Sequence, residues 1–186
     1  GRVWQGLISG PRNTPVLYGL GETAPYNWSG DWDEIADVEL KIRGLQAGQG
    51  LIDGPTNMAM GDPHAGLSVD LDTLADYVVN LPTPQSPPVL DSEQVIRGET
   101  IFLEQNCAAC HAGTSGTDGL AYDVGTGGTF DTPTLNWLWQ SAPYYHDGRA
   151  ATLQDVFISE GTHRIIGDIS PADLDALITY LHSRPG

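Results

Sequence analysis

A stretch of nineteen residues occurs twice in this chain, and this repeat limits the fold more than any other feature. Residues 13–31, NTPVLYGLGETAPYNWSGD, align without gaps with residues 131–149, DTPTLNWLWQSAPYYHDGR. Eight aligned pairs are identical, including the Thr-Pro near the start and the Ala-Pro-Tyr in the middle of each copy. Self-similarity of this kind indicates a repeated structural unit. We therefore expect two related units in tandem.

A proline-rich segment marks the boundary between the two units. Residues 81–90, LPTPQSPPVL, contain four prolines within seven positions. Such a composition favours an extended, semi-rigid connector and opposes regular secondary structure. The sequence thus predicts one unit over residues 1–85 and a second over residues 86–186.

Helical periodicity is clearest in the second unit. A first helix is predicted from Ser92, as its N-cap, to the residues before Cys107, with one apolar face (Val95, Ile96, Glu99, Phe102 and Leu103). The last helix is capped by Ser170 and has Pro171 at its first position. A shorter helix should begin at Thr152 and end before Gly161, and residues 112–129 are expected to form only loop.

The two cysteines of the chain lie together in the sequence Cys107-Ala-Ala-Cys110-His111. A redox pair normally opens a helix after a strand, whereas this pair follows a helix and precedes a glycine-rich loop. A zinc site needs about four ligands, but the other histidines are scattered singly. Cys-x-x-Cys-His is instead the attachment signature of c-type haem, with two thioether bonds and the histidine as proximal iron ligand.

The sequence around this motif favours the haem interpretation. Gly98 and Phe102 lie on the side of the preceding helix where a terminal helix could cross closely, with Leu177 or Tyr180 as partner. The fold class expected is therefore mainly α and loop-rich, a cytochrome c-like helical domain around one covalent haem c. The repeat register would place a matching cysteine pair of the first unit before residue 1. The first unit is thus expected to be truncated, without a haem motif, and the chain to be a fragment.

The second unit resembles a known family. The segment GTGGTFDTPTLNWLWQSAPYYHDGRAATLQDVF, with Cys107-Ala-Ala-Cys110-His111 before it and a helix after it, is similar to the second cytochrome domain of the bacterial di-haem cytochrome c peroxidase and MauG family. The first unit resembles the part of the family's first haem domain that follows its haem motif. Two features differ: this chain has no first haem motif, and Asn136-Trp137 stands where the family commonly has arginine and asparagine.

The second axial ligand is expected after the haem motif and before the terminal helix, which leaves His146 and His163. In peroxidases of the family this ligand is a methionine in the segment that corresponds to residues 155–170. That segment has no methionine here, but it contains His163. We therefore expect His111 and His163 to ligate the iron, with His146 as the alternative.

Other residues receive lesser roles. Tyr144 and Arg149 could donate hydrogen bonds to haem propionates, with an ion pair between Arg149 and a nearby acid as the equal alternative. The resemblance implies a backbone contact from Pro133 on the proximal side. Met58 and Met60 are expected to pack in the first unit, with ligation of a haem carried by the missing part as the lesser alternative. His64 and His182 are expected to lie at the surface. No calcium site is assigned, because no acidic cluster has EF-hand spacing.

The charge of the chain bears on its partners. The 186 residues carry 24 Asp and Glu against 8 Lys and Arg, a formal net charge of -16. This charge opposes binding to nucleic acid or to an anionic membrane, and a basic redox protein fits it better. No run of residues is apolar enough for a membrane span. Covalent haem attachment implies the periplasm or the cell surface of a bacterium.

These features predict an electron-transfer cytochrome rather than an enzyme. The alternative is a fragment or subunit of a di-haem peroxidase or MauG-like enzyme that reduces hydrogen peroxide. In that case an upstream domain or chain would carry the further haem.

Overall fold

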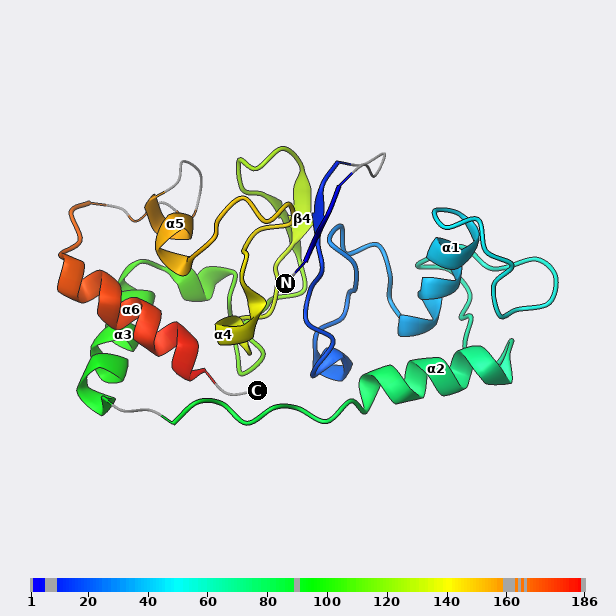
Figure 1. Cartoon of the computed structure of the whole chain (residues 1–186), viewed down its shortest axis with the longest axis horizontal. Helices are drawn as coiled ribbons and strands as arrows, with labels where there is room; N and C mark the ends of the chain where they lie inside the picture. The colour runs from blue at the N-terminus through cyan, green and yellow to red at the C-terminus, as the bar shows by residue number, and fades with distance from the viewer. Residues whose placement is uncertain are drawn as a thin grey trace.

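Helices and loops make up most of the molecule (Figure 1). The computed structural model describes residues 2–5, 10–88, 91–158, 163, 165 and 167–184. The strands form two short antiparallel pairs, β1 with β2 and β3 with β4. The expected mainly α, loop-rich class is confirmed. In chain order the elements are β1 (Val3–Trp4), β2 (Arg12–Asn13), η1 (Leu20–Glu22), η2 (Ile35–Asp37), α1 (Val38–Arg43), α2 (Val69–Val79), α3 (Ser92–Glu104), η3 (Cys107–Ala109), β3 (Ala121–Asp123), β4 (Thr129–Asp131), α4 (Leu138–Ser141), α5 (Leu153–Ile158) and α6 (Pro171–Ser183).

The crossing of α3 and α6 is the main packing contact of the C-terminal half. A Cβ atom on Gly98 would lie 2.1 Å from the carbonyl oxygen of Ala176 and 2.6 Å from Cβ of Tyr180, so only glycine permits this approach. Phe102 packs on Tyr180 with a ring separation of 5.4 Å. The predicted helix crossing is therefore present, and it buries Phe102 and Leu177 in the larger hydrophobic core.

Helix ends follow the sequence signals with one exception. The Ser170 hydroxyl accepts a hydrogen bond from the amide of Asp173, as an N-cap should. Thr152 and Asp155 bond reciprocally at the start of α5. At α3, however, the cap is Asp91, whose carboxylate accepts from the amides of Glu93 and Gln94. A carboxylate one residue earlier makes two capping bonds, and Ser92 becomes the first helical residue.

Two further expectations for this half were wrong. Residues 112–129 are not all loop, because β3 pairs with β4 and their turn uses the glycines of this segment. Ile96 and Leu103 are 64% and 61% exposed, so the buried face of α3 is centred on Gly98, Ile101 and Phe102. The close helix crossing at Gly98 decides which side of α3 is buried. That side is rotated by part of a helical turn from the side that the apolar residues alone predict.

The repeated segments also share backbone features. Tyr26 forms a β-bridge with Trp32, and the equivalent residues 118 positions later, Tyr144 and Ala150, do the same. The left-handed residues Asn27 and Gly30 likewise correspond to the left-handed Tyr145 and Gly148. The sequence repeat is thus a repeat of conformation.

The two copies meet through reciprocal hydrogen bonds. The amide of Asn13 donates to the carbonyl of His146 (2.6 Å), and the amide of Asp131 donates to the carbonyl of Trp28 (2.9 Å). Asp131 is the repeat equivalent of Asn13, and His146 is the equivalent of Trp28. The copies are therefore joined with local two-fold pseudo-symmetry near the middle of the molecule.

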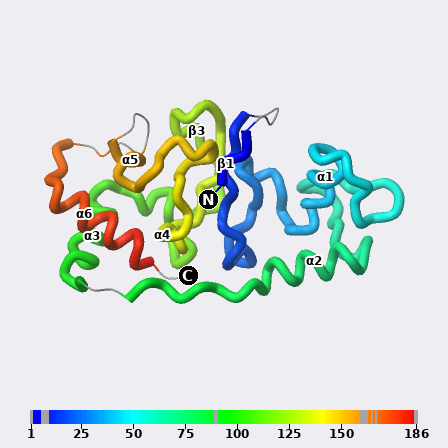
Figure 2. Tube along the Cα trace, in the orientation of Figure 1, coloured from blue at the N-terminus to red at the C-terminus, as the bar shows by residue number. Residues whose placement is uncertain are grey.

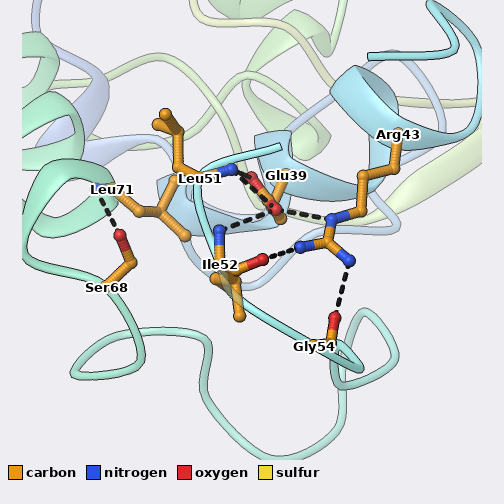
Figure 3. Close-up of polar contacts among 7 residues, drawn as sticks. All are labelled: Glu39, Arg43, Leu51, Ile52, Gly54, Ser68 and Leu71. Carbon is orange, nitrogen blue, oxygen red and sulfur yellow. Dashed lines mark hydrogen bonds and ion pairs between the residues drawn. The ribbon is translucent and has the colours of Figure 1, made fainter. Parts of the chain in front are cut away.

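Residues 38–68, which lie between η2 and α2 around α1, contain the additional residues of the N-terminal half (Figure 1). Within it Glu39, which is fully buried, accepts hydrogen bonds from Arg43 Nε (2.7 Å) and from the amides of Leu51 and Ile52 (Figure 3). Arg43 also donates to the carbonyl of Gly54. Burial opposes ionisation of Glu39, but these hydrogen bonds outweigh it and lower its pKa. The carboxylate thus fixes a loop that lacks regular structure.

Four side chains differ from their predicted environments. Met58 and Met60 do not pack, since they are 80% and 59% exposed in the loop before α2. His64 was expected at the surface but is completely buried, beside Asp37. His182 is partly buried on α6, and this burial lowers its pKa. These environments depend on tertiary neighbours that the local sequence does not reveal.

From α2 the chain continues through the extended residues 81–88 toward α3, as the trace in Figure 2 shows. The proline-rich segment is therefore a connector without helix or strand in its described part. No helix in the described ranges is both long and apolar enough to cross a membrane.

Candidate haem site

The haem motif follows α3 directly. Asn106 adopts a left-handed conformation (φ 58°) and turns the chain into η3, which begins at Cys107. The amide of His111 donates to the carbonyl of Cys107 (3.0 Å), which closes the turn across the motif. Both cysteines are free and partly exposed, and Cys107 packs against the larger core. The three side chains of the motif are thus held on one compact turn.

Neither thiol has the environment of a redox pair or a preformed zinc site. Burial raises the pKa of Cys107 and, with the nearby Asp118 carboxylate, that of Cys110. Reactive and metal-bound cysteines normally show the opposite shift. Within the described residues, the motif's sulfur and nitrogen atoms do not converge as three ligands of one ion would. The structure therefore gives no support to the two alternatives considered for the sequence.

His111 is held in one orientation. Its Nδ1 lies 2.9 Å from the carbonyl oxygen of Gly116, so the ring donates there and leaves its other nitrogen as a lone-pair donor. Burial lowers the pKa of His111, although the carbonyls of Gly116 and Pro133 oppose the shift. The imidazole is accordingly neutral at pH 7, which is the form that binds iron. A backbone contact from Pro133 to the proximal side of a haem stays a prediction.

Gly116 was not foreseen as a site residue. It has φ +66°, and a Cβ atom there would lie 2.9 Å from Cβ of Leu135. A side chain would therefore displace the carbonyl that orients His111. Gly116 belongs to a loop with several glycines, and nothing in the sequence distinguishes it from the others.

His163 lies opposite His111. Their ring centres are 6.2 Å apart, and Tyr145 packs edge-on against His163 at 5.6 Å. Burial, with a smaller effect from His111, lowers the pKa of His163 to about 4. Its Nδ1 is buried without a hydrogen-bond partner. The predicted pair of histidines is therefore brought together by the fold, with both rings neutral. Residues 161, 162, 164 and 166, which flank His163, lie outside the described residues.

The spacing of these rings fits a metal ion between them. Two imidazoles bonded to one ion from opposite sides, at about 2.0 Å each, have ring centres about 6 Å apart. Direct stacking would bring them closer, as it does for His146 and Phe130 at 3.8 Å.

The alternative ligand, His146, has different neighbours. It stacks on Phe130 and meets the edge of Trp28 at 6.3 Å, and it is 7% exposed. Burial lowers its pKa. Among the ring contacts of the described residues, His111 pairs with His163 and not with His146. His146 instead lies where the two copies of the repeat meet, since its carbonyl accepts a hydrogen bond from the amide of Asn13.

Tyr144 and Arg149 make contacts within the protein. The Tyr144 hydroxyl donates to the carbonyl of Leu138 (2.9 Å). Arg149 forms an ion pair with Asp147 (2.6 Å) and donates to the carbonyl of Thr126. The ion pair was one of the two expectations for Arg149, and a contact from either residue to a propionate stays a prediction.

A polar pair beside Cys110 was also missed by sequence analysis. The Tyr122 hydroxyl donates to Asp118 (2.7 Å), and this bond raises the pKa of Tyr122 to about 12. Tyr122 lies on β3, a strand that the sequence did not predict. The pair covers the motif on the side of the glycine-rich loop.

Comparisons with known proteins agree with this site. Residues 95–185 match the cytochrome c family model. The whole chain aligns with cytochrome c551 peroxidase of Pseudomonas aeruginosa at 24% identity, over 67% of that protein. Two solved structures have a similar fold: hydrazine synthase of Kuenenia stuttgartiensis (TM-score 0.72, 20% identity, 98% of this chain and 76% of that one) and a MauG-like protein associated with microbial copper homeostasis (TM-score 0.68, 19% identity, 100% and 77%).

The fold and the motif together define residues 95–185 as a cytochrome c domain, which implies covalently bound haem c. The resemblance of the chain to the cytochrome c peroxidase and MauG family is likewise confirmed.

Proposed function

We propose that this chain transfers single electrons through one haem c attached to Cys107 and Cys110, with His111 and His163 as axial ligands. The observation that carries the proposal is the pair of partly buried, neutral imidazoles whose ring centres are 6.2 Å apart. An iron held by both rings has no open position for peroxide, which favours electron transfer over catalysis.

The protein residues define the conditions for that transfer. Haem supplies an iron that alternates between its ferric and ferrous forms. The Gly116 carbonyl orients His111, and Phe102, Leu135 and Leu177 surround the site with apolar packing that excludes water. Two histidine ligands give a lower reduction potential than a histidine and a methionine. Tyr144 and Arg149 remain the proposed donors to the propionates.

A second candidate function follows from the N-terminal half. A cavity of about 380 Å³ there is lined mainly by apolar residues, including Pro15, Leu17, Leu20 and Tyr26. Their repeat equivalents are Pro133, Leu135, Leu138 and Tyr144. The last three belong to the larger core or pack against it, as Cys107 of the haem motif does. This cavity favours a second cytochrome c-like unit over residues 1–85, which would hold a further haem together with an upstream domain or chain. In that arrangement the protein would be part of a peroxide-reducing enzyme.

Charge and chemistry suggest the partner and the compartment. The net charge of -16 favours a redox partner with a basic surface. Haem c is attached outside the bacterial inner membrane, so we propose a periplasmic or cell-surface location.

Optical spectra of the purified haem-loaded chain, with and without hydrogen peroxide, separate the two functions. An electron carrier should show a low-spin spectrum and no rapid peroxide-dependent oxidation of a reduced donor. Rapid turnover, or a high-spin population, would contradict the proposal and favour the enzyme. An intact mass without the increment of one covalent haem would contradict both.

A further inference from the structure

A buried polar cluster lies in the N-terminal half, away from the haem motif. It consists of Glu34, which precedes η2, Asp37, which ends η2, and His64, in the loop before α2. One ligand atom from each residue lies within 4.8 Å of the others. The cluster joins two segments that are separated in the chain by α1 and the long loop after it.

The imidazole of His64 is the unusual member. Its side chain is 0% exposed, and Nδ1 lies 2.8 Å from Asp37 Oδ1 and 3.6 Å from Glu34 Oε1. Neither ring nitrogen has a partner with hydrogen-bond geometry. Buried polar groups are nearly always satisfied by protein, water or an ion. An imidazole directed at two carboxylates, without such a bond, is an arrangement that a cation would complete.

The neighbouring Glu39 shows how this fold satisfies a buried carboxylate without an ion. Its oxygens accept from two backbone amides and from the Arg43 guanidinium (Figure 3). Glu34 and Asp37 also accept from backbone amides, those of His64, Ala65 and Asp33. The described ion pairs, however, bring no lysine or arginine to either residue. Their negative charge therefore has only His64 as a neighbouring balancing group.

An acidic cavity borders the cluster at Glu34. Asp33, Glu34, Asp72 and Asp76 line it, and no basic residue is among its described lining residues. Glu34 belongs to both the cavity and the cluster, and its side chain is 24% exposed. Clefts lined by one sign of charge concentrate ions of the opposite sign. Cations are therefore concentrated beside Glu34, the partly exposed member of the cluster.

We propose that Glu34, Asp37 and His64 bind one first-row divalent cation of the zinc type. The imidazole disfavours calcium and magnesium, which prefer oxygen-only sites, and carboxylates with imidazole suit Zn²⁺. Ligand atoms around a tetrahedral zinc ion at about 2.0–2.1 Å lie about 3.4 Å apart. The two distances from His64 Nδ1, 2.8 and 3.6 Å, lie on either side of this value. Bound metal would fasten the loop before α2 to η2.

The test uses the haem-loaded chain and Zn²⁺ alone. After removal of metal with a chelator and dialysis, titration calorimetry should show one tight Zn²⁺ site, and Zn²⁺ should raise the melting temperature. His64→Gln should weaken that site by at least about 100-fold, since even outer-shell substitutions cost about 10–100-fold. His182→Gln, a histidine substitution on α6, should leave binding unchanged.

A second variant guards against misfolding of His64→Gln. Glu34→Gln removes a partly exposed ligand and should also weaken the site at least tenfold, with the haem spectrum unchanged. The proposal is overturned if the parent chain binds Zn²⁺ no more tightly than the His64→Gln and Glu34→Gln variants do. It is also overturned if His182→Gln weakens Zn²⁺ binding as much as those two substitutions do.

Discussion

Asp131 shows how desolvation dominates the pKa of a titratable residue in this molecule. It ends β4, where the two copies of the repeat meet, and its Oδ1 is buried without a hydrogen-bond partner. Burial, with repulsion from Asp118, raises its pKa to about 7. The folded protein therefore binds a proton between about pH 4 and pH 7 that the unfolded chain releases, so this residue makes the fold less stable as pH rises through that range.

Asp131→Asn should remove this pH dependence. We expect the variant to gain about 1–2 kcal/mol of unfolding free energy at pH 8, after allowance for solvent screening, and little at pH 4. Urea unfolding at the two pH values measures the difference. Asp123→Asn, at an exposed site in the same hairpin, is the control. Equal effects of both substitutions at pH 8 would contradict the assignment.

Individual residues were predicted unevenly from the sequence. Cys107, Cys110 and His111 stand in a motif whose spacing implies its chemistry, so they needed no structure. His64 gave no such signal, because a single histidine in a loop is buried or exposed according to neighbours such as Asp37, distant in the chain. Gly116 acts through its backbone carbonyl, and Tyr122 lies on a strand that the sequence did not predict. The identity of either residue alone does not reveal its role.

At the scale of elements, α6 and the crossing of α3 with α6 could be predicted because capping and periodicity are local signals. Ser170 and Pro171 begin α6 as expected. The hairpin of β3 and β4 was missed because three-residue strands in a glycine-rich segment have too little alternation to detect. The buried face of α3 was misplaced because packing at Gly98, not apolarity, decides it.

Gly98→Ala tests this crossing. The added methyl group would overlap the Ala176 carbonyl, so α3 and α6 must separate, at a cost of about 1–3 kcal/mol. Thermal unfolding of the haem-loaded chain should show the loss. Glu99→Ala, at the next and exposed position of α3, should leave stability nearly unchanged. If the two variants have the same melting temperature, the close approach of α3 and α6 does not limit stability.

At the scale of the whole molecule, the repeat predicted more than any single element. It anticipated two related units, and the two copies share their β-bridges and left-handed residues. It could not anticipate how they meet, since the reciprocal bonds of Asn13 and Asp131 use backbone groups. Nor could it predict the fold of residues 38–68, a segment longer than its counterpart before α6, which depends on Glu39 and the cluster around His64.

The central claim is that His111 and His163 together hold the iron. The most direct measurement is the optical and electron paramagnetic resonance spectrum of the oxidised protein, compared with those of His163→Ala and His146→Gln. The account predicts a low-spin ferric haem in the parent chain and in His146→Gln, and conversion to high-spin in His163→Ala. A low-spin spectrum that persists in His163→Ala, or that is lost in His146→Gln, would contradict it.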